Sequence, residues 1–224
     1  ELSLADELSW DKDGDGRFME LECKTTDTLT VLASGGKCFS VDAAALPSGR
    51  GDGAPMNTLI NSGPDDIVWV GLGSAAARLL MANSAGNGFL CKLGDLATKT
   101  KQGKDFMNVP EGAKALPPVF IQKETKEPQV AALSSDARLL VFPMDELPVR
   151  PNGGVGVQLM ALPDRISLAA VAVTDGKTLV VSGIKRKNRA DETLDAKMLK
   201  EFAGKRAQRG HVCDVGFRPD RLGD

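Results

Sequence analysis

The stretch T-V-L-A-S-G-G-K-C-F-S-V-D-A-A-A-L-P, residues 30–47, decides the fold because the chain repeats its pattern. The copies are L-M-A-N-S-A-G-N-G-F-L-C-K-L-G-D-L-A at 80–97 and A-A-L-S-S-D-A-R-L-L-V-F-P-M-D-E-L-P at 131–148. Each is an apolar run, a turn of small residues, a second apolar run and a short stretch that ends in leucine. The closing leucines are spaced by 50 and 51 residues: Leu46, Leu96 and Leu147. A period of this size indicates a repeat architecture.

Each copy predicts a β-hairpin, because turn residues such as Ser34-Gly35-Gly36 supply permissive backbone angles. A single hairpin cannot bury its apolar face, so neighbouring units must stack. A more divergent fourth copy begins at Leu179 and closes on Leu199. The sequence therefore predicts an all-β, propeller-like disk of about five blades of four-stranded antiparallel sheet, the first of them incomplete. The expected blades are 1–27 (partial), 28–77, 78–128, 129–177 and 178–224.

Loops that contain glycine follow the closing leucines and lead to methionines, as at Gly103 and Met107 and at Gly156 and Met160. These methionines are expected to open a further strand in each blade and to pack in the core. One helix is expected at 192–203, capped by Asp191 and ended by Gly204.

The composition fits a β-rich globular chain of 224 residues with 24 glycines, 12 prolines and a net charge of −2. The charge is uneven, because residues 1–27 hold nine acids and three bases, whereas residues 177–221 hold twelve bases and six acids. No apolar run has the about 18 residues that a membrane span needs, and no export leader is recognised. The four cysteines form no close pair, so a reduced, cytoplasmic protein is expected.

The repeats resemble the C-terminal domains of the A subunits of bacterial gyrase and topoisomerase IV. The resemblance rests on G-K-C-F-S-V-D-A-A-A-L-P-S-G-R-G-D-G-A-P-M at 36–56, where an L-P step leads into an R-G-x-G-x-P loop. It continues through S-A-G-N-G-F-L-C-K-L-G-D-L at 84–96, R-L-L-V-F-P-M-D-E-L-P at 138–148 and G-I-K-R-K-N-R at 183–189. The resemblance implies a β-pinwheel, whose blades exchange strands and which binds and bends duplex DNA along its outer edge.

The resemblance also implies partners outside this chain. The N-terminal cleavage core of the same polypeptide would cut DNA through a tyrosine, and the B subunit of topoisomerase IV would hydrolyse ATP. The chain has no tyrosine, so it is expected to guide strand passage, in decatenation and supercoil relaxation, without catalysing it. No cofactor is expected in this domain, ATP and magnesium belonging to other domains of the enzyme, and no membrane partner is expected.

Two alternatives stay open. Gyrase A domains carry a box like Q-R-R-G-G-K-G in the first blade, but D-K-D-G-D-G stands at Asp11–Gly16 here, which favours topoisomerase IV over a gyrase wrapping domain. A protein-binding β-propeller is the other alternative. Asp11, Asp13, Asp15 and Glu22 match the spacing of a calcium loop. The strand-like sequence after Glu22 argues against an EF-hand, so no metal site is expected.

Basic residues in the loops between repeats and in the final repeat are the functional candidates. Matching loops of a ring recur around one rim, where Lys and Arg can contact phosphates along a bent duplex with little sequence specificity. The candidates for DNA contact are Lys37, Arg50, Lys99, Lys101, Lys104, Arg150, Lys185, Arg186, Lys187, Arg189, Lys205, Arg206 and Arg209.

Overall fold

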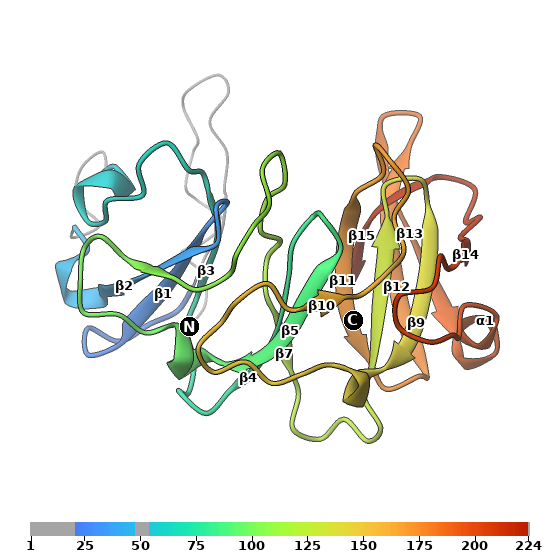
Figure 1. Ribbon diagram of the computed structural model, residues 1–224, viewed down its shortest axis with the longest axis horizontal. Helices are drawn as coiled ribbons and strands as arrows, with labels where there is room; N and C mark the ends of the chain where they lie inside the picture. The colour runs from blue at the N-terminus through green and yellow to red at the C-terminus, as the bar shows by residue number, and fades with distance from the viewer. Residues whose placement is uncertain (1–20, 48–53, 224) are drawn as a thin grey trace, which may run out of the picture.

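The computed structural model describes residues 21–47 and 54–223. It contains four antiparallel hairpins, one in each repeat (Figure 1). The small-residue turns join the two strands of each hairpin, so the predicted all-β fold is confirmed. The hairpins are β1 (Thr28–Ala33) with β2 (Lys37–Asp42), β4 (Arg78–Ala82) with β5 (Asn87–Lys92), β8 (Gln129–Ser134) with β9 (Arg138–Pro143), and β12 (Thr178–Lys185) with β13 (Asn188–Asp195).

A third strand pairs with the first strand of every hairpin. These strands are β3 (Ile67–Gly71), β7 (Val119–Ile121), β11 (Leu168–Thr174) and β15 (Arg218–Gly223). Residues of all four third strands line one hollow of about 540 Å³. The third strands are therefore the inner strands of four blades arranged around a common centre, and we call these blades A to D in chain order.

The outermost strand of blades A, B and C comes from the following repeat. β6 (Lys104–Asp105) pairs with β2, β10 (Val157–Gln158) with β5, and β14 (His211–Val212) with β9. Blade D has three strands among the described residues, in the order β13-β12-β15. The strand exchange that the resemblance implied is therefore present in three successive blades.

Met107 and Met160 follow these exchanged strands instead of opening them, and both side chains are buried. The reason is visible at Gly36, in the β1–β2 turn, whose carbonyl oxygen accepts hydrogen bonds from the backbone N–H groups of Phe106 and Met107. Gly36 has φ +87°, and a Cβ there would collide with the Met107 carbonyl oxygen. The crossing chain thus lies directly against the hairpin turn, which requires glycine at this position.

Apolar cores fill the spaces between blades, and the middle blades contribute to two of them. Alternate residues of a strand point to opposite faces of its sheet. In β4, Leu79 and Met81 enter the core shared with blade A, while Leu80 and Ala82 enter the core shared with blade C. Blade A also has a core on its other face, around Phe39. This packing explains why successive residues are buried along the first three hairpins.

Short helices follow the second strand of each hairpin. In the first repeats they are the 3-10 turns η1 (Ala43–Ala45), η3 (Leu93–Leu96) and η4 (Met144–Glu146), and a further turn, η2 (Met56–Thr58), precedes β3. The last repeat has a helix, α1 (Ala196–Glu201), whose N-cap Asp195 accepts hydrogen bonds from the N–H groups of Lys197 and Met198. The predicted helix at 192–203 is therefore wrong in its first turn, because residues up to Asp195 pair with β12.

An incomplete first blade was predicted for residues 1–27. Residues 1–20 of this segment lie outside the described residues, and residues 21–27 contain no strand. Within the described part of the chain, no helix is long and apolar enough to cross a membrane.

Candidate nucleic-acid interface

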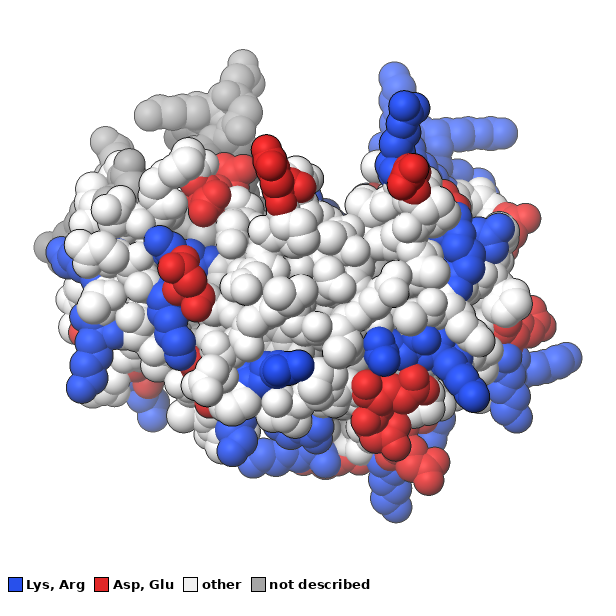
Figure 2. All heavy atoms as spheres, viewed as in Figure 1, with Lys and Arg blue, Asp and Glu red and all other residues white. Residues whose placement is uncertain are grey.

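Four of the candidate cations lie at matching places on successive blades. Lys99 and Lys101 lie between η3 and β6, Arg150 between η4 and β10, and Lys205 between α1 and β14. In each case the chain is crossing from one blade to the outer edge of the preceding blade, and we call these segments the crossover loops. All four side chains are exposed and make no ion pair with a described residue. Figure 2 shows that charged side chains lie mostly around the periphery of the visible face, whose centre is uncharged.

Two other candidates, Lys37 and Lys104, stabilise the exchanged strand β6 against β2. The ammonium group of Lys37 lies 3.7 Å from a carboxylate oxygen of Asp105. That of Lys104 donates a hydrogen bond of 2.8 Å to the Asp95 carbonyl oxygen and lies 5.2 Å from the centre of the Phe106 ring. These interactions give both lysines a part in holding β6 against β2.

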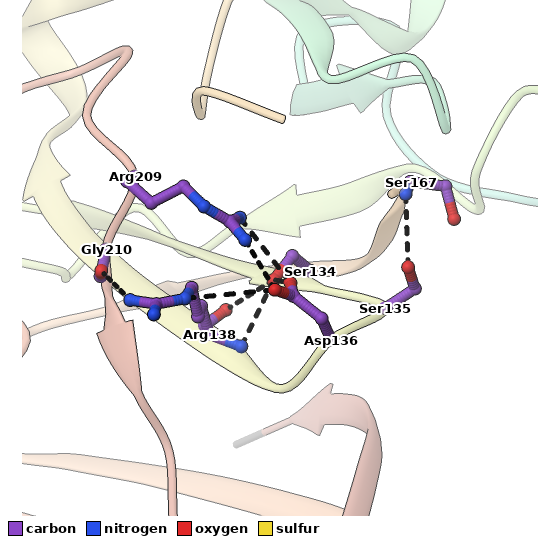
Figure 3. A network of polar contacts seen from close by, with 7 residues as sticks. All are labelled: Ser134, Ser135, Asp136, Arg138, Ser167, Arg209 and Gly210. Atoms are coloured by element: carbon purple, nitrogen blue, oxygen red, sulfur yellow. Dashed lines mark hydrogen bonds and ion pairs between the residues drawn. The ribbon is translucent and has the colours of Figure 1, made fainter. Parts of the chain in front are cut away.

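Arg209 belongs to a polar network that joins the β8–β9 turn to the chain before β14 (Figure 3). Its guanidinium donates hydrogen bonds to the carboxylate of Asp136, which also accepts one from the Ser134 hydroxyl. Arg138 donates a hydrogen bond of 3.0 Å to the Gly210 carbonyl oxygen. Burial alone would raise the pKa of Asp136, but the hydrogen bonds from Ser134 and Arg209 outweigh it, and the pKa is lowered.

Arg206 is likewise engaged within the fold. Its guanidinium donates a hydrogen bond of 2.7 Å to the Gln158 carbonyl oxygen, and its backbone N–H donates to the Glu146 carboxylate. The third crossover loop thus presents Lys205 to solvent, while its two arginines stabilise the loop. Arg50 lies outside the described residues.

The remaining candidates lie on the β12–β13 hairpin. Lys185, Arg186 and Lys187 are exposed at its tip, where Arg186 and Lys187 have positive φ angles of 47° and 76°. Arg189 makes a two-pronged ion pair with Asp220, at 3.0 and 2.9 Å. β12 has eight residues, so at about 3.3 Å per residue the tip lies roughly 23 Å from the end that leads to Lys205. The structure therefore separates these candidates from the crossover loops.

Sequence reasoning missed two exposed cations, Arg218 and Arg221. They lie on β15 opposite Ile184 and Ser182 of β12, with an irregularity in register between the two pairs. Only the pairing register puts them on the sheet face that carries Arg189, across β12 from it, and no spacing along the chain carries that information.

Among residues 21–47 and 54–223, no three His, Cys, Asp or Glu side chains cluster as metal ligands. Asp11, Asp13 and Asp15 of the calcium-like loop lie outside that range. Burial raises the pKa of the Cys38 thiol to about 12 and that of Cys213 to about 11, so both stay protonated and weakly nucleophilic.

Known proteins share both the sequence pattern and the fold. No protein-family model matches the chain. The A subunit of DNA topoisomerase 4 from Haemophilus influenzae is 31% identical over 214 residues, an alignment that covers 92% of this chain and 28% of that protein. The solved structure of the Escherichia coli ParC C-terminal domain is similar with a TM-score of 0.79 and 26% identity, over 91% of this chain and 83% of that one.

A solved DNA gyrase A C-terminal domain is similar with a TM-score of 0.64 over 88% of this chain and 64% of that chain, and its 16% identity speaks for the fold alone. The exchanged blades and these similarities define the class: the chain is a β-pinwheel of the type found at the C-terminus of type II topoisomerase A subunits. Within that class it is similar in sequence to topoisomerase IV A subunits and in structure to the C-terminal domain of one of them. It spans 28% of the length of the Haemophilus relative.

Proposed function

We propose that this chain binds duplex DNA through its crossover loops and bends it beside the cleavage core of a topoisomerase IV enzyme. The observation that carries the proposal is the recurrence of Lys99, Lys101, Arg150 and Lys205 on successive crossover loops, exposed and unpaired among the described residues. A row of such cations around a curved edge suits successive phosphates of a bent duplex.

The proposed partners are double-stranded DNA, the cleavage core of the same polypeptide and the B subunit of topoisomerase IV, with ATP and magnesium bound by those other parts of the enzyme. The domain would guide which DNA segments the core passes. Phosphate contacts carry no sequence information, so preference should come from DNA shape and bendability. Because the net charge is −2, long-range attraction is small, and binding should be weak and strongly salt-dependent.

The test compares two double substitutions of equal charge change. Lys99→Glu/Lys101→Glu alters a crossover loop, and Lys123→Glu/Lys126→Glu alters exposed lysines of the β7–β8 loop. Duplex affinity is measured by fluorescence anisotropy over a range of salt concentrations. We expect the crossover variant to bind about tenfold more weakly and to flatten the log–log salt slope by roughly 0.9 for each phosphate that is no longer neutralised.

The control variant should change affinity much less. Equal losses in both variants would mean that net charge, and not the crossover loops, determines affinity. If neither variant changed affinity or salt slope, the DNA proposal would be wrong and a protein-binding propeller would be the better account. In the whole enzyme, the crossover variant should impair strand passage on linked circles more than cleavage of short linear duplexes.

A further inference from the structure

Blade D has one sheet face that no other described blade covers. Residues directly opposite each other in a sheet share a face. Ile184 lies opposite Arg189 on β13 and Arg218 on β15, and Ser182 lies opposite Asp191 and Arg221. These residues define what we call the end face.

The other face of blade D packs on blade C. Leu179, Val181 and Leu194 of blade D share a core with Ala131, Leu139 and Val141 of blade C. The end face points the opposite way, and its side chains meet solvent: Ile184 is 50% exposed, and Arg189, Arg218 and Arg221 are all exposed. An apolar partner blade would bury these guanidinium groups at high cost, so the composition of the face suits a charged ligand.

Cations dominate this surface. The hairpin tip contributes Lys185, Arg186 and Lys187 and the end face contributes three arginines, against the carboxylates of Asp191 and Asp220. Asp220 is already bound by Arg189, which leaves Arg218 and Arg221 without a described ion pair. Lys and Arg side chains project above the disk at the upper right of Figure 2, where the β12–β13 hairpin lies in Figure 1. The guanidinium groups of such arginines have two N–H donors spaced to bind two oxygens of a phosphate.

We infer that the end face and the hairpin tip form a second DNA-binding surface, which holds a second duplex segment while the crossover loops hold the first. This inference rests on the proposed function. Lys205 and the hairpin tip lie at opposite ends of the blade D strands, and the end face points away from blade C. A domain with both surfaces occupied binds a crossing of two duplexes, the arrangement that strand passage requires.

The test is a two-duplex capture with the whole domain. One duplex is immobilised, the domain is added, and a fluorescent duplex of different sequence is then supplied. The test variant is Arg218→Gln/Arg221→Gln, which removes charge without placing new carboxylates beside Asp191. We expect it to bind the first duplex within about threefold of the original domain and to capture the second at least about tenfold less well, since two phosphates are no longer neutralised. Arg218→Lys/Arg221→Lys should restore capture.

Four outcomes are decisive. Undiminished capture by the Gln variant would overturn the inference, and so would an original domain that binds one duplex and captures no second. In both cases the proposed function stands, because the first duplex is still bound; no binding of the first duplex would remove both. Capture could also come from two associated domains, so the Gln variant is mixed with Lys99→Glu/Lys101→Glu. Restored capture in that mixture would overturn the inference, because no single domain in it has both surfaces.

Discussion

Blades B and D are each built on a hairpin of the same kind, yet blade B is buried on both faces of its sheet and blade D on only one. In β4, the four residues Leu79 to Ala82 are all buried, whereas in β12 buried Leu179 and Val181 alternate with the more exposed Val180 and Ser182. The difference shows how a repeat signals its place in the stack. Blade B, which packs against two blades, has buried residues at successive positions of its strand, while blade D, which packs against one described blade, has them at every second position.

The same contrast appears at the hairpin turns. The turns of blades A to C accept backbone hydrogen bonds from the exchanged chain, at Gly36, Gly86 and Ala137. The turn of blade D is two-residue, basic and exposed. We therefore expect substitutions in the exchanged segments to destabilise the fold more than matched substitutions in blade D.

Phe106→Ala should have the largest effect on stability. The Phe106 ring is buried in the exchanged segment, 5.9 Å from the Phe89 ring centre, so its removal leaves a cavity and should lower the free energy of unfolding by about 3–5 kcal/mol. Phe217→Ala in blade D, where the ring is partly buried, should cost less than half as much. Urea denaturation followed by circular dichroism measures both, and equal losses would contradict the comparison.

Gly36→Ala should have the next largest effect and lower the free energy of unfolding by about 2–3 kcal/mol. A side chain at positive φ is strained, and here it also collides with the Met107 carbonyl oxygen. The matched control is Gly216→Ala in blade D. Gly216 has φ +71°, but a Cβ there would meet only the Lys185 ammonium group, at 3.9 Å. Its cost should be about 1 kcal/mol. Thermal unfolding of the two variants side by side separates strain from collision.

The two arginine–aspartate pairs offer a smaller contrast. Double-mutant cycles should give about 1 kcal/mol for Asp136–Arg209, whose side chains are 28% and 33% exposed, and about 0.5 kcal/mol for Arg189–Asp220, at 45% and 39%. The pKa of Asp136 is lowered in the fold. Its contribution is therefore complete above the ordinary carboxyl pKa of about 3.9 and is lost as pH falls through the lowered value. Asp136→Ala should remove that part of the acid dependence of unfolding.

The smallest effect is expected at the hairpin tip. Lys187→Gly replaces a residue at positive φ with one that adopts this conformation freely, so stability should change by less than about 0.5 kcal/mol and in the favourable direction. A clear loss, seen by differential scanning calorimetry, would mean that the tip touches more of the protein than the comparison allows.

Much of this architecture could be predicted from the sequence, because hairpin turns and closing leucines are local signals. The strand exchange was accessible through the family resemblance alone, since a two-residue strand such as β6 has no pattern of its own. The helix at 192–203 was extended too far because Glu192 to Asp195 suit a helix locally, and pairing with β12 overrides that preference. For the interface, sequence found the exposed cations but could not tell that Arg209 is held by Asp136, 73 residues away, or that Arg218 and Arg221 share a face with Arg189.

The exchange of outer strands also sets the order in which the blades can be completed during translation. The edge of β2 stays open until β6 emerges, and that of β9 until β14 emerges, which at about 5–20 residues per second leaves each edge unpaired for several seconds. An unpaired edge is a template for aggregation. Each of blades A to C therefore lacks its outermost strand until the next repeat has been synthesised. If translation pauses or stops, the most recently completed hairpin has an unpaired edge and is the part of the nascent chain most prone to aggregate.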